Sequence, residues 1–127
     1  MAKVTVTKGD AEGFYTGTAG EFKISIERTG NKVPRSIDLV LLGLGTCTIS
    51  TVATFMERKE WPSGELAVEL SAEFDDKAGC YKDISVVLHT GERVTPEMRK
   101  VLLAVAKSCR IHKTLDARPQ MSVDVRE

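Results

Sequence analysis

The sequence is short of several features that identify common classes of protein. Its 18 lysine and arginine residues balance 18 aspartate and glutamate residues, so the net charge is zero. Without an excess of positive charge, no field attracts nucleic acid or an anionic membrane surface. We therefore expect neither nucleic acid nor a membrane as a partner.

Export signals are also lacking. Residues 1–7 alternate apolar and polar side chains like a strand, without the apolar core of a signal peptide. The three cysteines are an odd number, which argues against a secreted disulfide framework. We expect the chain in the reducing cytoplasm, where a pair of cysteines is more often catalytic or metal-binding.

One uncharged run, residues 39–56, reaches the lower length limit for a membrane span. Glycine, serine and threonine interrupt it at seven positions: Gly43, Gly45, Thr46, Thr48, Ser50, Thr51 and Thr54. We interpret the run as a buried helix of a protein outside the membrane. Pro34 and Ser36 open this helix, which is expected to end near Lys59, and Asp38 lies in its first turn, where a carboxylate suits the helix dipole.

Apolar side chains occupy nearly every face of this helix, and such a helix must be covered on all sides. A single domain of 127 residues can hardly cover it alone. We therefore expect residues 1–127 to form one domain and a second copy of the chain to cover part of the helix.

The other segments show either the spacing of apolar residues typical of a helix or the alternation typical of a strand. Thr95, Pro96 and Glu97 form a strong helix start, and the helical spacing after them includes Cys109, seven residues after Leu102. The expected strands are residues 4–8, 13–18, 21–28, 66–74, 84–88 and a closing strand at 121–125. This order predicts an α+β fold, with a long helix lying against antiparallel sheets.

Two cysteines are predicted to point into the core between the helices. Cys47 lies in the apolar helix among small and hydroxylated neighbours, and Cys109 lies on the apolar stripe of the second helix. From the residues alone three uses stay open: inert buried side chains, a redox pair, or a zinc site with His112 as a further ligand. Cys80 is interpreted as an incidental surface thiol.

Two motifs in order resemble the OsmC/Ohr family of thiol peroxidases. The segment PRSIDLVLLGLGTCT (34–48) resembles its first cysteine motif, and ERKEWP (57–62) is similar to the end of the same helix. The segment CRIHKTL (109–115) resembles its second cysteine motif. The resemblance covers nearly the whole chain.

The resemblance implies an intertwined homodimer with central helices buried between two sheets. It also implies reduction of organic hydroperoxides, or of hydrogen peroxide, with Cys47 as the attacking thiol and Cys109 as the resolving thiol. External thiols of a dithiol or lipoyl type would then reduce the disulfide. No cofactor or metal is implied.

The chain departs from the family pattern at three places. The better-studied peroxidases use an N-terminal arginine and a glutamate near the start of the long helix to activate the thiolate. This chain has no arginine before Arg28, and Ile37 best matches the glutamate. The proline after the second cysteine is Arg110 here.

Arg35, Asp38 and His112 are therefore our candidates for activating or orienting the thiolate. The alternative function is a non-catalytic dimer that binds an apolar small molecule at the interface.

Overall fold

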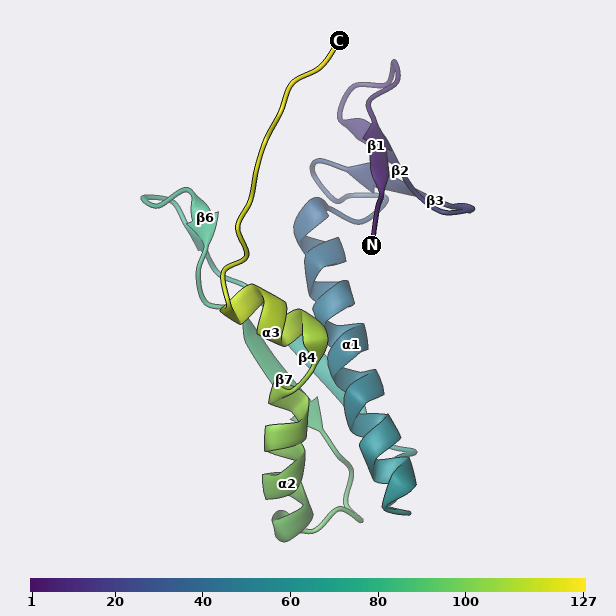
Figure 1. The fold of residues 1–127 in the computed structure, drawn as a ribbon, viewed down its shortest axis with the longest axis vertical. Coiled ribbons are helices and arrows are strands. Elements are labelled where there is room, and N and C mark those ends of the chain that lie inside the picture. Colours follow the sequence, from purple (N-terminus) through teal and green to yellow (C-terminus); the bar gives the residue numbers. More distant parts are fainter. The chain divides into compact units, whose positions relative to one another are not determined.

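The computed structural model describes residues 1–127. Its helices and strands are shown in Figure 1, and the chain divides into two compact units, Met1–Leu42 and Gly43–Glu127. The combination of helices with small antiparallel sheets confirms the predicted α+β class.

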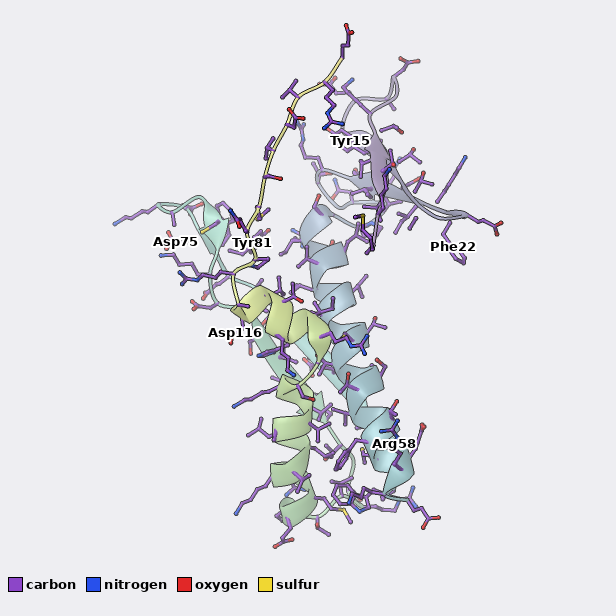
Figure 2. All side chains as sticks on the ribbon, viewed as in Figure 1. Tyr15, Phe22, Arg58, Asp75, Tyr81 and Asp116 are labelled. Carbon is purple, nitrogen blue, oxygen red and sulfur yellow. The ribbon has the colours of Figure 1, made fainter.

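The N-terminal unit contains a three-stranded antiparallel sheet in the order β1-β2-β3. Its strands are β1 (Thr5–Thr7), β2 (Phe14–Ala19) and β3 (Phe22–Glu27). The three predicted strands are confirmed, and pairs such as Tyr15 with Ile26 set the register between β2 and β3. Figure 2 shows Phe22 projecting from the tip of the β2–β3 hairpin, where 82% of it is exposed.

Glu27 ends this sheet and organises the loop after it. Its buried carboxylate accepts hydrogen bonds from the backbone N–H groups of Lys32 (2.7 Å) and Val33 (3.4 Å) and from the Thr29 hydroxyl (2.9 Å). The Lys32 N–H, supported by the other donors, outweighs burial and holds the pKa of Glu27 below its usual range.

The long helix α1 (Ser36–Arg58) begins where the sequence predicts. Asp38 accepts a hydrogen bond from the Arg35 backbone N–H (2.9 Å) and forms an ion pair with the Arg35 guanidinium (3.1 Å). At the other end Glu60 has φ 59°, and the Trp61 N–H donates to the Met56 carbonyl at 2.8 Å. This left-handed residue and the bond across five residues are the Schellman arrangement that closes helices.

In the C-terminal unit α1 packs on the strands β4 (Ala67–Ser71) and β7 (Ser85–His89) and on the helix α2 (Pro96–Lys107). The two strands pair antiparallel, and a second short hairpin joins β5 (Phe74–Asp75) to β6 (Cys80–Tyr81). The strand predicted at residues 66–74 is thus divided, because β5 pairs with β6 rather than continuing β4. Figure 1 shows α2 beside the later turns of α1.

The core of this unit is centred on Val52, Met56, Val94 and Leu102. Trp61 packs against this core and meets the ring of Phe55 edge to face at 5.6 Å between centroids. Trp61 is therefore a packing residue at the end of α1.

Only one stripe of α1 is buried in the single chain. Leu44, Thr48, Val52 and Met56 recur at four-residue spacing and are all buried, together with Gly45. Apolar side chains on other faces stay exposed, and Leu42 is 61% exposed. The helix is long and apolar enough to cross a membrane by length and composition, criteria that the core helix of a soluble protein also meets.

Two predictions about the C-terminal part are wrong for the single chain. The helix α2 does not extend to Cys109: it is capped by Ser108, and Cys109 starts a separate helix, α3 (Arg110–Asp116). Residues 121–125 form no strand, and Val123 is 92% exposed. A strand needs a neighbouring strand for its backbone hydrogen bonds, and the single chain offers none to this segment.

Candidate active site

Cys47 lies half-buried in the middle of α1, next to the buried stripe. The hydroxyls of two residues in the following turn donate to its carbonyl oxygen, Thr51 at 2.7 Å and Ser50 at 3.1 Å. Cys47 is therefore held on a regular helix rather than on a loop, which fixes the direction of its side chain.

Cys109 lies at the break between α2 and α3, where it caps the shorter helix. Its sulfur accepts a hydrogen bond from the His112 backbone N–H at 3.4 Å, the position that an N-cap side chain satisfies. Only 1% of Cys109 is exposed, and the Thr48 hydroxyl lies 3.8 Å from its sulfur. The resolving candidate is thus enclosed, with its sulfur facing α1.

The two cysteines meet, and their contact acts on the acidity of Cys47. Burial raises the pKa of the Cys47 thiol, but several hydrogen bonds to its sulfur together hold that pKa below its ordinary value. In decreasing order they come from the Cys109 thiol and the backbone N–H groups of Ile111 and Arg110. The Thr51 hydroxyl, which donates to the Cys47 carbonyl oxygen, has a smaller effect in the same direction. Each of the bonds to the sulfur favours the thiolate because it places a donor on the charged atom.

Cys47 opens into a pocket of about 550 Å³ in the C-terminal unit. The pocket is lined by Cys47, Ser50, Thr51, Thr54, Phe55, Arg58, Val105, Ser108 and Arg110. Two arginines and no acidic residue belong to this lining. Figure 2 labels Arg58, one of the two, near the end of α1.

The other predicted site residues have different surroundings. Arg35 and Asp38 pair with each other at the start of α1. His112 contributes its backbone N–H to Cys109, while its side chain lines a separate pocket of about 260 Å³ beside Leu44. Cys80 is exposed on β6.

No group of three or more histidine, cysteine, aspartate or glutamate side chains is placed to hold a metal ion. The structure therefore provides no ligand set for the zinc interpretation of Cys47, Cys109 and His112.

Sequence reasoning missed Arg58, Arg110 and Thr51 as pocket residues. Thr51 lies four residues after Cys47, one helical turn away, so its proximity was predictable from helical spacing. Arg110 directly follows the second cysteine, and its place where the family has proline was the available signal. Nothing in the sequence singled out Arg58.

Comparisons with known proteins agree with this fold and motif order. The family model for OsmC-like protein matches residues 29–124. The comparison with curated proteins returned no match.

Solved structures of similar fold include an OsmC-like protein from Mycoplasma pneumoniae, with a TM-score of 0.81, 17% identity, and 93% of this chain and 89% of that chain covered. Another is the organic hydroperoxide resistance protein OhrB of Bacillus subtilis, with a TM-score of 0.65, 20% identity, and 93% and 92% covered. A hypothetical protein from Aquifex aeolicus VF5 has a TM-score of 0.78, 13% identity, and 93% and 89% covered.

At these identities the solved structures show a shared fold, and the family model shows the relationship in sequence. It spans about three quarters of the chain and includes both cysteine motifs. The chain belongs to the OsmC-like protein family.

Proposed function

We propose that this protein is a thiol-dependent peroxidase that reduces organic hydroperoxides, and also hydrogen peroxide, in defence against oxidative stress. The observation that carries the proposal is the Cys47 thiol, which lines an open pocket, has a lowered pKa and is hydrogen-bonded to a second, enclosed thiol. Family membership and the fold shared with a hydroperoxide resistance protein support it.

The proposed cycle uses the two cysteines in turn. The Cys47 thiolate attacks the terminal oxygen of the hydroperoxide, the O–O bond breaks, and the leaving alkoxide takes a proton to become an alcohol. Cys47 is then a sulfenic acid. The Cys109 sulfur attacks it, a disulfide forms and water leaves. Two external thiol groups, such as the pair carried by one dithiol or dihydrolipoyl group, are oxidised to a disulfide as they reduce the Cys47–Cys109 disulfide and restore both protein thiols.

The thiolate is stabilised in this proposal by the donors that contact its sulfur, namely the Cys109 thiol and the N–H groups at the start of α3. Arg35, Asp38 and His112 keep an orienting role in the proposal. Arg35 and Asp38 set the first turn of the helix that carries Cys47, and the His112 backbone holds Cys109.

The assembly in this proposal is an intertwined homodimer in the cytoplasm, with residues 1–127 as its single domain and neither nucleic acid nor membrane as partner. The exposed apolar side chains of α1 and of residues 121–125 support a second copy, because large apolar surfaces left open on a chain mark contact surfaces.

The test is a count of thiols, by intact mass, after addition of one equivalent of an organic hydroperoxide. The proteins are wild type, Cys47→Ser and Cys109→Ser; serine at position 109 keeps an oxygen that caps α3. We expect rapid loss of two thiols in wild type, a sulfenic acid that dimedone traps in Cys109→Ser, and no reaction at Cys109 in Cys47→Ser.

Three unreacted thiols in wild type after prolonged exposure would exclude the peroxidase function. The alternative function, a non-catalytic dimer that binds an apolar small molecule, would then be favoured. An apolar depression of about 380 Å³ in the N-terminal unit, lined by side chains such as Val6, Phe22 and Ile24, supports that alternative.

A further inference from the structure

Thr48 interrupts the buried stripe of α1 with a hydroxyl group. The other buried side chains at four-residue spacing are apolar, namely Leu44, Val52 and Met56, and Thr48 among them is only 1% exposed. Burying a hydroxyl costs free energy unless it is hydrogen-bonded, whereas an apolar side chain at the same place carries no such cost. The contacts of this hydroxyl therefore show why a polar residue is tolerated in the stripe.

The Thr48 hydroxyl has two neighbours. It donates to the Leu44 carbonyl at 2.8 Å, and it lies 3.8 Å from the Cys109 sulfur, a hydrogen-bond distance for an atom as large as sulfur. The Leu44 carbonyl lies inside α1, where the backbone N–H four residues later also bonds to it, so it does not depend on the hydroxyl. The Cys109 sulfur is the neighbour with a chemical use for this group.

The contact between Thr48 and Cys109 is enclosed within a single chain. Both residues are 1% exposed, and both belong to the C-terminal unit. A second copy of the chain adds covered surface, so this contact is present with or without the proposed homodimer.

In the proposed cycle, the step that needs a donor at Cys109 is its attack on Cys47. The attacking form of a cysteine is the thiolate, and a charge enclosed away from water is costly unless donors contact it. The His112 backbone N–H, 3.4 Å from the Cys109 sulfur, is one such donor. The Thr48 hydroxyl can supply a second by turning its hydrogen from the Leu44 carbonyl to the sulfur, because a hydroxyl hydrogen rotates to suit its acceptor.

We propose that Thr48 is the side-chain donor that supports Cys109 when its sulfur attacks Cys47. The inference rests on the proposed function and adds a residue to its resolving step. In that step the Cys109 thiolate bonds to the Cys47 sulfur, the S–O bond of the sulfenic acid breaks, and the leaving hydroxide takes up the proton that Cys109 lost, so that water forms. Thr48 contacts the attacking sulfur and exchanges neither a proton nor an electron with it.

The attack of Cys109 is measured first without peroxide. In a Cys80→Ser background, dithiobis(nitrobenzoate) converts Cys47 to a mixed disulfide and releases one nitrothiobenzoate. The Cys109 thiolate then attacks the Cys47 sulfur, the mixed disulfide breaks and a second nitrothiobenzoate leaves. The rate of this second release, followed by absorbance in stopped flow, is independent of reagent concentration because the attack occurs within the protein.

The variants separate the hydroxyl from the shape of the side chain. Thr48→Val keeps the shape and removes the hydroxyl, while Thr48→Ser keeps the hydroxyl and removes a methyl group. Thr114→Val is the matched control, because the Thr114 hydroxyl also donates to the carbonyl four residues before it, that of Arg110, at 2.8 Å. The control thus removes the same kind of local bond on α3.

We expect Thr48→Val to slow the second release roughly three- to tenfold, the effect of one lost hydrogen bond. Thr48→Ser should restore most of the rate, and Thr114→Val should leave it unchanged. A second release as fast in Thr48→Val as in wild type would overturn the proposal. A rate in Thr48→Ser as low as in Thr48→Val would also overturn it, because packing and not the hydroxyl would then be the cause.

The same variants are then compared after addition of an organic hydroperoxide. Dimedone at a fixed concentration competes with Cys109 for the Cys47 sulfenic acid, and intact mass gives the ratio of dimedone adduct to disulfide. This ratio does not depend on how fast the sulfenic acid forms. We expect it to rise roughly three- to tenfold in Thr48→Val and to return toward the wild-type value in Thr48→Ser.

The outcomes separate the two proposals. A second release that depends on the Thr48 hydroxyl, in a protein that forms no sulfenic acid with hydroperoxide, would support the role of Thr48 and overturn the peroxidase function. A protein that forms both adduct and disulfide in a ratio that Thr48→Val leaves unchanged would retain the peroxidase function and overturn the role of Thr48. If wild type releases no second nitrothiobenzoate, the two-cysteine cycle and the role of Thr48 are both wrong.

Discussion

The sulfur of Cys47 experiences two opposed effects, and their balance determines how it reacts. Partial burial disfavours the charged thiolate, while donors from Cys109 and the start of α3 favour it. The donors prevail because several of them converge on one atom. The break between α2 and α3 is what makes this possible, since a continuous helix would have bonded its own N–H groups internally.

The lowered pKa of Cys47 predicts reactivity at lower pH than an ordinary thiol. Only the thiolate reacts, so the rate of alkylation rises with pH through the pKa of Cys47. We expect half-maximal alkylation by iodoacetamide below about pH 8.5, the ordinary cysteine value. In Cys109→Ala, which removes the thiol donor, the curve should shift to higher pH.

The reference for this measurement is the same protein in urea, with Cys80→Ser in all samples. A folded curve that coincides with the unfolded one would contradict the lowered pKa. It would also favour the non-catalytic alternative, because an unactivated thiol reacts slowly with peroxide.

At the scale of elements, the contact between α1 and the β4–β7 sheet depends on a small residue. A Cβ added at Gly45 would lie 2.6 Å from Cδ1 of Leu70 and 3.5 Å from Cγ1 of Val68. Glycine costs a helix about 1 kcal/mol relative to alanine, so its presence here reflects the close approach of β4. This contact holds the turn of α1 that precedes Cys47.

Gly45→Val is therefore expected to destabilise the protein by about 1–3 kcal/mol, the usual cost of overpacking. The measurement is the free energy of unfolding from urea denaturation. The double variant Gly45→Val, Leu70→Ala removes the side chain that the new methyl groups meet. If the added Leu70→Ala substitution does not recover part of the loss caused by Gly45→Val, steric conflict with β4 is not the cause.

At the scale of the whole molecule, the main feature is apolar surface that the single chain leaves exposed to solvent. Residues 121–125 alternate exposed apolar side chains, Met121 at 86%, Val123 at 92% and Val125 at 90%, with polar ones. This alternation is typical of a strand with one buried face. We infer that the segment pairs with a second copy of the chain, in keeping with the proposed homodimer.

The proposed dimer predicts that lysine substitutions in residues 121–125 weaken association only when they lie on the apolar face of this segment. In Val123→Lys, Val125→Lys the charges fall on the apolar face, and the dimer should weaken at least tenfold, the effect of about 1.4 kcal/mol. In the control Ser122→Lys, Asp124→Lys the lysines fall on the opposite face and the dimer should persist. Light scattering after gel filtration over a range of concentrations gives the mass. A monomeric wild-type protein would exclude the homodimer.

Much of the fold was predictable from local patterns. The start of α1 at Ser36, the Thr95 cap of α2 and the three N-terminal strands are confirmed, because capping and side-chain periodicity are properties of neighbouring residues. The two cysteine motifs are also runs of neighbouring residues, so the family was predictable from the sequence as well.

Contacts between distant residues were decided only by the tertiary structure. The sequence by itself pointed both cysteines toward the core, but it extended α2 through Cys109 and left their meeting open. The break at Ser108 turns Cys109 and the N–H of Arg110 toward Cys47, and the packing of α1 against α2 and α3 brings Arg58 into the same pocket. Residues so far apart in sequence meet only through packing, which no local periodicity encodes.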